Sequence, residues 1–357
     1  MQTSLELCTQ IVPPLLDWYH ENHRTLPWRS DPTPYHVWVS EIMLQQTRVA
    51  AVLEYYRRFM DALPTVEDLA AVEEDVLLKL WQGLGYYNRA RNLQKAAKIV
   101  VEQYGGQFPG TYEELLRLPG IGEYTAGAIA SIAFGQCVPA VDGNVLRVIT
   151  RITGDEGDIT RPDTKKRIRG LLMDTMPAAF PGTYNQALME LGALVCLPNG
   201  APDCEHCPVS ALCTAHREGR TDRIPVKAPK PPRKAESRRV YLIVHDGKVA
   251  LRRRPERGLL ARLWEFPNEL TRRRRSPRRE PDFAASLTFL EEGPTGKHIF
   301  THREWHMSSG FYAAPSPALP EGWVWADAEE LETVYAVPNA FDAFKPAVFR
   351  YLRGESR

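Results

Sequence analysis

The segment that most constrains how this chain can fold is Leu118-Pro119-Gly120-Ile121-Gly122-Glu123-Tyr124-Thr125-Ala126. Segments with the apolar periodicity of helices flank it on both sides. Gly120 and Gly122 can adopt positive φ at little steric cost, so successive backbone N–H groups can point outward at the start of the next helix. Such a turn can bind a phosphate group. Taken alone, the pattern is more often a helix C-cap followed by an ordinary turn.

The residues around this turn favour a helix-hairpin-helix. Upstream, Thr111-Tyr112-Glu113-Glu114 fits a capping box that begins the helix leading into the turn. Downstream, residues 124–131 are mostly small, which permits close packing of a second helix. A lone carboxylate, Asp142, follows about twenty residues after the turn, beside Gly143 and Asn144. We therefore expect a phosphate-binding hairpin with an acidic residue near it.

The composition indicates a globular protein of two domains. The chain has 357 residues, of which 43% are hydrophobic and 25% charged. No apolar run approaches the roughly 18 residues that a membrane span needs. The N-terminal residues lack the features of a secretory signal, so we expect a cytoplasmic protein. The net charge of +1 hides a local excess of Arg and Lys in the second half, and it does not exclude nucleic acid as a partner.

Four of the six cysteines are clustered, at Cys196, Cys204, Cys207 and Cys213. In a reducing compartment such clustering favours a metal site over disulfides. Four thiolates suit zinc as well as an iron-sulfur cluster, so the residues themselves leave both alternatives open.

A second carboxylate, Glu41, stands in a predicted helix over residues 36–48. Its helical neighbours at i−4, i−3 and i+3 are Val37, Trp38 and Leu44, so the carboxyl lies on an apolar stripe. Desolvation there would raise its pKa and make it a proton donor near neutral pH. The alternative is a solvated glutamate with no special role.

Two segments combine aromatic and basic residues next to a turn. In the first, Trp28 lies between Arg24 and Arg29, where it could stack on a base or pack in the core. In the second, residues 81–93, Tyr86 could insert between bases while the arginines hold phosphates. A glycine-capped helix start with ordinary aromatic packing explains the second segment equally well.

Together these segments resemble a known family, the adenine DNA glycosylases of the MutY type, within the endonuclease III superfamily of helix-hairpin-helix repair enzymes. The motifs that carry the resemblance are spread over most of the first 213 residues, and they are Trp28-Arg29, Val39-Ser40-Glu41-Ile42-Met43-Leu44-Gln45-Gln46-Thr47, Gly83-Leu84-Gly85-Tyr86-Tyr87, residues 118–126, Val141-Asp142-Gly143-Asn144-Val145 and the four cysteines. Jointly they are highly specific.

The resemblance implies a reaction and roles for four residues. Glu41 would protonate N7 of adenine and help to activate water, while an ionised Asp142 would stabilise the oxocarbenium-like sugar or bond to it transiently. Asn144 would orient that carboxylate or the water. Bifunctional relatives have a nucleophilic lysine where this chain has Tyr124, and a phenol cannot form an imine. We therefore expect a monofunctional glycosylase.

The resemblance also implies which residues bind DNA. Extruding a base costs a few kcal/mol, which Gln46 and Tyr86 could offset by filling the helix stack. Thr47 adds a hydrogen-bonding group, and Gly120 and Gly122 belong to the phosphate-binding turn. The residues expected around the flipped adenine are Arg24, Trp28, Arg29, Leu44 and Gln186.

For the cysteines at 196–213, the resemblance implies a 4Fe-4S cluster, with zinc as the alternative. The spacing is Cys196-x7-Cys204-x2-Cys207-x5-Cys213, and the first gap is one residue longer than is usual in the superfamily.

Residues 221–238 are expected to form a linker. The stretch from Thr221 to Arg239 contains four prolines and seven Lys or Arg against two acids, which predicts an extended basic connector. Beyond it, residues 239–251 read as two strands around an Asp246-Gly247 turn. Residues 258–268 resemble part of a Nudix-type fold, as found at the C-terminus of MutY proteins.

Where a hydrolytic Nudix domain needs a glutamate-rich helix, this chain has an arginine run at 272–279, so nucleotide hydrolysis is not expected. The run could contact DNA or form a solvated loop. Phe300-Thr301-His302 matches the Phe-Ser-His loop with which the family reads 8-oxoguanine, with Thr in place of Ser. Taken alone, those three residues are more often a strand end.

The sequence therefore predicts a multi-domain protein. Residues 1–220 form a mainly α helix-hairpin-helix glycosylase domain with an iron-sulfur loop, 221–238 a linker, and 239–357 an α/β Nudix-like domain that recognises the lesion. The expected partner is duplex DNA with adenine opposite 8-oxoguanine or guanine, bound by a bacterial cytoplasmic monomer with no membrane contact. The alternatives are a bifunctional endonuclease III-like enzyme for oxidised pyrimidines and a non-catalytic DNA-binding protein with a structural metal.

Overall fold

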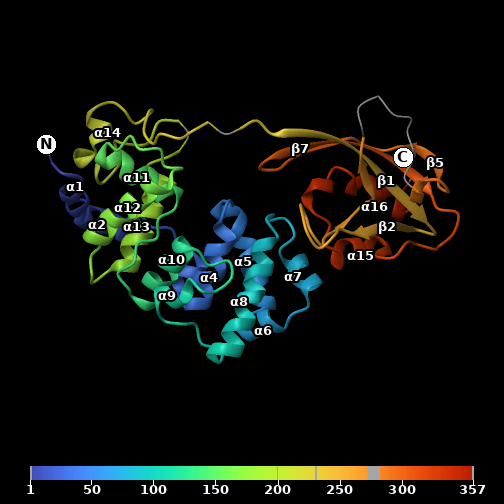
Figure 1. Cartoon of the computed structure of the whole chain (residues 1–357), viewed down its shortest axis with the longest axis horizontal. Coiled ribbons are helices and arrows are strands. Elements are labelled where there is room, and N and C mark those ends of the chain that lie inside the picture. Colours follow the sequence, from blue (N-terminus) through green and yellow to red (C-terminus); the bar gives the residue numbers. More distant parts are fainter. Residues whose placement is uncertain (1, 199, 230, 272–281, 356–357) are drawn as a thin grey trace. The chain divides into compact units, whose positions relative to one another are not determined.

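A computed structural model describes residues 2–198, 200–229, 231–271 and 282–355, and they form two compact units (Figure 1). The helical unit consists of Met1–Ala71 and Arg91–Pro229, and the sheet unit consists of Val72–Ala90 and Lys230–Arg357. The arginine run at 272–279, for which DNA contact and a solvated loop are the alternatives, lies outside the described residues. None of the helices described is both long and apolar enough to cross a membrane.

The helical unit is built from short helices joined by turns. Its helices are α1 (Ser4–Gln10), α2 (Val12–Asn22), α3 (Pro27–Ser30), α4 (Pro34–Leu44), α5 (Val49–Ala62), α6 (Val66–Ala71), most of α8 (Asn88–Tyr104), α9 (Tyr112–Leu115), α10 (Glu123–Phe134), α11 (Gly143–Thr153), α12 (Pro162–Thr175), α13 (Pro181–Leu194), η1 (Ser210–Leu212) and α14 (Thr214–Arg217).

Helix α11 lies at the centre of one core of this unit. All of its residues from Val145 to Ile152 are buried, and apolar side chains of α1, α2, α12 and α13 pack around it. Tyr184 of α13 and Leu15 of α2 are fully buried in the same core. A helix buried on every side can carry polar residues only if they find partners inside the protein.

Small residues let α10 pack closely, as the sequence predicts. A Cβ atom added to Gly127 would lie 2.6 Å from the carbonyl oxygen of Pro139. Gly182 at the start of α13 approaches α10 in the same way, since its added Cβ would lie 2.7 Å from the Ser131 carbonyl oxygen. Close packing of α10 against α4 and α13 brings residues from three helices to one place.

The helix-hairpin-helix consists of α9, the turn and α10. The Thr111 hydroxyl accepts a hydrogen bond from the Glu114 N–H, so Thr111 is the N-cap of α9. The second half of the predicted capping box differs, because the Glu114 carboxylate accepts from the Thr111 hydroxyl. Gly120 has φ of 79°, and an added Cβ would lie 2.6 Å from Cβ of Asn92. Gly122 does not use the freedom that the sequence analysis ascribed to it, because as N-cap of α10 it is extended, with φ of −96°.

The sheet unit contains a mixed sheet with helices beside it. Its elements are α7 (Glu74–Leu80), the start of α8, β1 (Lys234–His245), β2 (Lys248–Arg253), β3 (Trp264–Glu265), β4 (Asn268–Leu270), η2 (Asp282–Ala284), β5 (Thr288–Glu292), β6 (Gly296–Ile299), β7 (Arg303–Ala313), β8 (Trp323–Ala326), α15 (Ala328–Thr333), η3 (Asn339–Phe341) and α16 (Lys345–Leu352).

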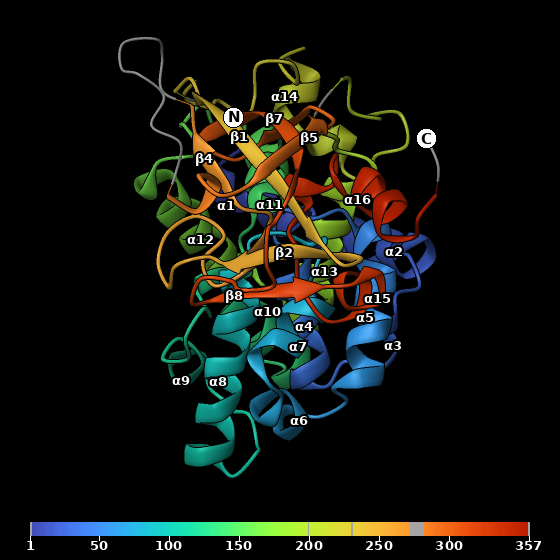
Figure 2. The ribbon, with the colours of Figure 1, turned by 90° about the vertical axis from the view of Figure 1, so that its right-hand side faces the viewer.

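The strand order is β3-β2-β1-β7-β5, with β4 paired to β1, β6 to β7 and β8 to β2. Strands β2 and β8 lie side by side (Figure 2). Strands β1 and β7 are parallel, and β1 and β2 are joined by the predicted turn, in which Asp246 and Gly247 both have positive φ. This backbone suits a two-residue hairpin.

Strand β1 begins at Lys234, inside the segment that the sequence analysis assigned to the linker. Its first residues pair with the start of β7, Lys234 opposite Arg303 and Glu236 opposite Trp305. Because these partners lie about 70 positions away in the chain, the basic and proline-rich composition of the segment does not indicate the strand. Further along, Val240, Leu242 and Val244 face the core beneath α15 and α16, while Tyr241 and Ile243 face the other side.

Candidate active site

A cleft of about 1190 Å³ opens in the helical unit between α3, α4, α10, α11 and α13. It brings together most of the residues that the sequence analysis placed near the reacting base. Those that line it are Arg24, Trp28, Arg29, Glu41, Leu44, Gln46, Thr47, Tyr124, Asp142, Asn144 and Gln186.

Glu41 is the buried carboxylate of this cleft, with only 6% of its surface exposed. It lies in α4, where its neighbours Val37 and Trp38 are buried too. The pKa of Glu41 is raised from 4.5 to about 7, chiefly by burial and also by the charge of Asp142, while a hydrogen bond from Tyr124 opposes the rise. Near neutral pH this carboxyl can therefore both hold and release a proton.

Tyr124 lies in the first turn of α10, and its hydroxyl donates a hydrogen bond to Oε2 of Glu41. The same hydroxyl oxygen lies 3.8 Å from Sδ of Met189. Burial and the two nearby carboxylates, Glu41 and Asp142, raise the pKa of the phenol well above 10. The phenol therefore keeps its proton at physiological pH and acts as a hydrogen-bond donor.

Asp142 is the N-cap of α11. One of its oxygens accepts a hydrogen bond of 2.7 Å from the Val145 N–H, and the other accepts one of 2.8 Å from Nδ2 of Asn144. Burial raises the pKa of Asp142, but both hydrogen bonds oppose that effect. The positive end of the helix dipole also favours the charged form. Of the two carboxyl groups, Asp142 thus has the surroundings better suited to an anion.

A third carboxylate, Glu190 of α13, was missed by the sequence analysis. It is 1% exposed and binds Arg24 with two side-chain hydrogen bonds of 2.8 Å, and Arg29 with one of 2.8 Å. Burial alone would raise the pKa of Glu190, but the two arginines outweigh burial and hold the pKa at about 2. The two predicted adenine-binding arginines are therefore held in place by one buried anion.

The signal for Glu190 in the sequence is a single acid among the small and apolar residues of 187–192. A charge in such a helix requires a buried partner. The partners lie more than 160 positions away, so the sequence indicates the need but not the partner.

The remaining predicted DNA-binding residues of the cleft are Trp28, Leu44, Gln46, Thr47 and Gln186. Trp28 is 5% exposed, and its ring meets that of Tyr56 edge-on at a centroid distance of 5.1 Å. Most of the Trp28 side chain is therefore packed in the core, which is one of the two alternatives for this residue. The Gln186 side chain accepts a hydrogen bond of 3.2 Å from the Tyr19 hydroxyl. Leu44 ends α4, and the exposed Gln46 that follows it has φ of 62°. Thr47 closes this turn with an N–H hydrogen bond to the Leu44 carbonyl.

Arg147 joins the cleft to the cysteine loop and was also missed. It is 3% exposed, and it donates to Oδ1 of Asn144 at 2.9 Å, to the Gly192 carbonyl at 2.8 Å and to the Cys196 carbonyl at 2.8 Å. Asn144 in turn holds Asp142. These contacts satisfy the charge of a buried arginine in α11 and fix the geometry around Asp142.

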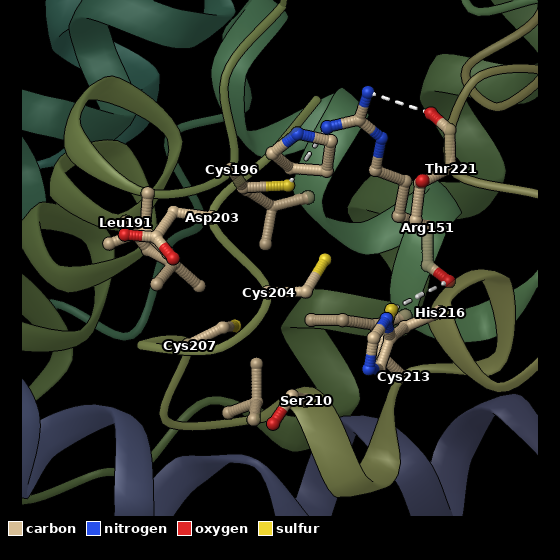
Figure 3. A pocket seen from close by; sticks show the side chains of 15 residues that line it. Arg151, Leu191, Cys196, Asp203, Cys204, Cys207, Ser210, Cys213, His216 and Thr221 are labelled. Carbon is tan, nitrogen blue, oxygen red and sulfur yellow. Dashed lines mark hydrogen bonds between the residues drawn. The ribbon is translucent and has the colours of Figure 1, made fainter. Parts of the chain in front are cut away.

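The four predicted metal ligands, Cys196, Cys204, Cys207 and Cys213, line one pocket (Figure 3). Arg151, buried in α11, reaches the sulfur of Cys196 at 3.2 Å, and the Cys213 thiol donates to the Arg151 carbonyl. Within the described parts of the chain, no three Cys, His, Asp or Glu side chains are arranged to hold a single metal ion as they stand.

The other predicted DNA-binding residues belong to the sheet unit. Phe300, Thr301 and His302 form the turn between β6 and β7, so the predicted loop is a hairpin turn. Thr301 and His302 are exposed. Tyr86 is also exposed and has φ of 48°. Its hydroxyl forms a hydrogen bond of 3.0 Å with the Thr301 hydroxyl.

Both parts of the chain are similar to known protein families. Residues 39–173 match the HhH-GPD superfamily of base excision DNA repair proteins, and residues 239–345 match the NUDIX domain. The adenine DNA glycosylase of Mus musculus is 38% identical, over 88% of this chain and 73% of the mouse protein. The adenine DNA glycosylase of Homo sapiens is 35% identical, over 96% of this chain and 73% of the human protein.

Two solved structures resemble the helical part. A thermostable thymine-DNA glycosylase is 30% identical with a TM-score of 0.55, covering 59% of this chain and 97% of its own. Endonuclease III in a non-covalent DNA complex is 26% identical with a TM-score of 0.53, covering 61% of this chain and 99% of its own.

Fold and site thus define a helix-hairpin-helix protein of base excision DNA repair with a Nudix-like domain. The identity to curated relatives is more specific. The chain belongs to the adenine DNA glycosylase family, which confirms the resemblance described from the sequence.

Proposed function

We propose that this protein binds duplex DNA and hydrolyses the N-glycosidic bond of an adenine paired with 8-oxoguanine or guanine. The observation that carries the proposal is the pair of carboxyl groups, Glu41 and Asp142, lining one cleft in different surroundings. A reaction that needs an acid on one side of a bond and an anion on the other requires such a pair.

Glu41 is the general acid. Its pKa of about 7 leaves about half of the molecules protonated at neutral pH. Protonation of N7 makes adenine a neutral leaving group and withdraws electrons from the bond that breaks. The Glu41 carboxyl that carries the proton is already hydrogen-bonded to Tyr124, so it is oriented before adenine enters the cleft.

Asp142 stabilises the positive charge that develops on the sugar. Its hydrogen bonds from Val145 and Asn144 keep the carboxylate in place, so little reorganisation is needed when the charge forms. Water then adds to the sugar carbon, and Glu41, having lost its proton to adenine, can accept one from that water.

The reaction ends with hydrolysis and leaves the DNA strand intact, because Tyr124 cannot form a Schiff base. Lys227 also lines the cleft and is the amine to check. Borohydride should trap little covalent adduct. Efficient trapping that disappears in Lys227→Ala would contradict the monofunctional assignment.

The turn Phe300-Thr301-His302 reads the base opposite adenine. Its support is the exposure of Thr301 and His302, whose side chains can both donate and accept hydrogen bonds. Thr301→Ala should reduce the preference for 8-oxoguanine over guanine as the opposing base, and an unchanged preference would reject this role.

Cys196, Cys204, Cys207 and Cys213 would hold a 4Fe-4S cluster, which would crosslink the loop at 196–213. The donor set fits, since four thiols meet at one pocket. Zinc is the alternative, because four thiolates suit a zinc ion as well. A colourless, iron-free but zinc-loaded protein prepared anaerobically would overturn the assignment.

One assay tests the proposed reaction. Excision is measured on duplexes with adenine opposite 8-oxoguanine, adenine opposite guanine, and thymine glycol, using the unchanged protein, Glu41→Gln and Asp142→Asn. We expect excision of adenine only, lost in both variants. If both variants still excise adenine, the proposed mechanism is wrong. Excision of thymine glycol would favour the endonuclease III-like alternative.

A further inference from the structure

A buried carboxylate, Glu236, lies at the base of the turn Phe300-Thr301-His302. It is in β1 and only 7% exposed. Its Oε2 accepts a hydrogen bond of 3.0 Å from Nε1 of Trp305, and its Oε1 accepts one of 3.1 Å from Nη1 of Arg303. Both donors belong to the first three residues of β7, directly after the turn.

The contact to Trp305 continues to the turn itself. The Trp305 ring is 1% exposed and meets the Phe300 ring edge-on at 4.8 Å. The Arg238 guanidinium lies over the Trp305 ring at 4.4 Å and 3.7 Å from Oε2 of Glu236. Trp305 is thus held by a hydrogen bond at its edge and a cation at its face, and Phe300 packs on a ring that cannot rotate freely.

The backbone around Glu236 holds both ends of the turn. The Lys234 N–H donates to the His302 carbonyl at 3.1 Å, and Nε of Arg233 donates to the Phe300 carbonyl at 3.2 Å. Thr301, between these two anchored residues, has an exposed side chain. Residues 233–236 therefore hold both ends of the turn, and the polar tip of the turn is exposed.

We propose that Glu236 is the positioning residue that sets the geometry of Phe300-Thr301-His302 for reading the base opposite adenine. The inference rests on the proposed lesion-reading function of that turn. Removing the carboxylate leaves the Trp305 N–H and the Arg303 guanidinium without their buried acceptor. The Trp305 and Phe300 rings then sample other rotamers, and Thr301 no longer meets its base at a fixed distance and angle.

The test compares single-turnover excision of adenine opposite 8-oxoguanine with excision opposite guanine, and takes the ratio of the two rates. We expect Glu236→Ala to lower this ratio on the order of tenfold, and Glu236→Gln to lower it less, because its amide oxygen still accepts from Trp305. Trp305→Phe keeps an aromatic ring but removes the N–H together with the five-membered ring of a fully buried indole, and it should also lower the ratio. Glu292→Gln breaks an ion pair with Arg239 on the same sheet and should leave the ratio unchanged.

The double variant separates positioning from general loss of stability. If Glu236 acts through Trp305, adding Trp305→Phe to Glu236→Ala should lower the ratio little further. Should Glu236→Ala fail to fold, Glu236→Gln and Trp305→Phe carry the test, each compared with Glu292→Gln by its thermal unfolding.

Thr301→Ala distinguishes failure of the inference from failure of the proposed function. If Thr301→Ala leaves the ratio unchanged, the turn does not read the lesion and the proposed function of the turn is wrong. If Thr301→Ala lowers the ratio but the folded Glu236 variants do not, or if they slow both substrates equally, the inference about Glu236 is overturned.

Discussion

Replacing Tyr124 with phenylalanine should shift the pH dependence of adenine excision in a direction that follows from the contacts of Glu41. Excision needs protonated Glu41, so its rate should fall as the pH rises through the pKa of about 7. The Tyr124 hydroxyl donates to the Glu41 carboxylate and so lowers that pKa. Without the hydroxyl the pKa rises, and the fall in rate moves to higher pH.

The size of the effect follows from the same contacts. The rise of the Glu41 pKa from 4.5 to about 7 corresponds to about 3 kcal/mol in favour of the protonated form. At pH 7 about half of the molecules then carry the proton, against about 0.3% for a carboxyl with a pKa of 4.5. Loss of one hydrogen bond to a charged group should shift the fall in rate upward by about one pH unit.

The measurement is single-turnover excision of adenine opposite 8-oxoguanine between about pH 5 and pH 9, where DNA release does not limit the rate. Glu41→Gln is the control and should be inactive throughout. A fall in rate for Tyr124→Phe at the same pH as for the unchanged protein, or at lower pH, would refute the reasoning.

Three further outcomes follow from the helical unit. Asp142→Asn should lower excision by at least about 10³-fold, with little change in thermal stability because asparagine also caps helices well. Glu190→Gln should lower excision by more than about tenfold, because it withdraws the charge that holds Arg24 and Arg29. Gly120→Ala should weaken DNA binding in fluorescence anisotropy and cost at least about 1 kcal/mol of stability, since φ is 79° there and the added methyl meets a neighbouring side chain.

Each of these outcomes can fail separately. The prediction for Asp142→Asn is contradicted if the excision rate of the variant is within about tenfold of that of the unchanged protein. Glu190→Gln is contradicted by unaltered excision in a folded variant, and Gly120→Ala by DNA binding and a thermal midpoint equal to those of the unchanged protein.

Several local features of the fold could be read from neighbouring residues alone. The N-cap at Thr111, the hairpin turn at Asp246-Gly247 and the apolar surroundings of Glu41 all depend on residues within four positions of one another. Interactions over such distances are set by backbone geometry and side-chain type, which the sequence states directly.

Other features depended on partners that the sequence does not bring together. Glu190 binds Arg24 and Arg29 across more than 160 positions. Strand β1 begins at Lys234 because β7 supplies hydrogen bonds there, although the segment has the composition of a linker. The extended backbone of Gly122 was likewise decided by its place at the N-terminus of α10, not by what glycine permits.

By itself, then, the sequence determined the family, the two kinds of domain and the residue types available for acid, anion and thiolate chemistry. The tertiary structure alone decided which charges neutralise each other and which distant groups add to or oppose the effect of burial on each carboxyl group. The physical reason is that a pKa depends on burial and on charges within a few ångströms. Only the packing of α4, α10, α11 and α13 brings Glu41, Tyr124 and Asp142 into one cleft.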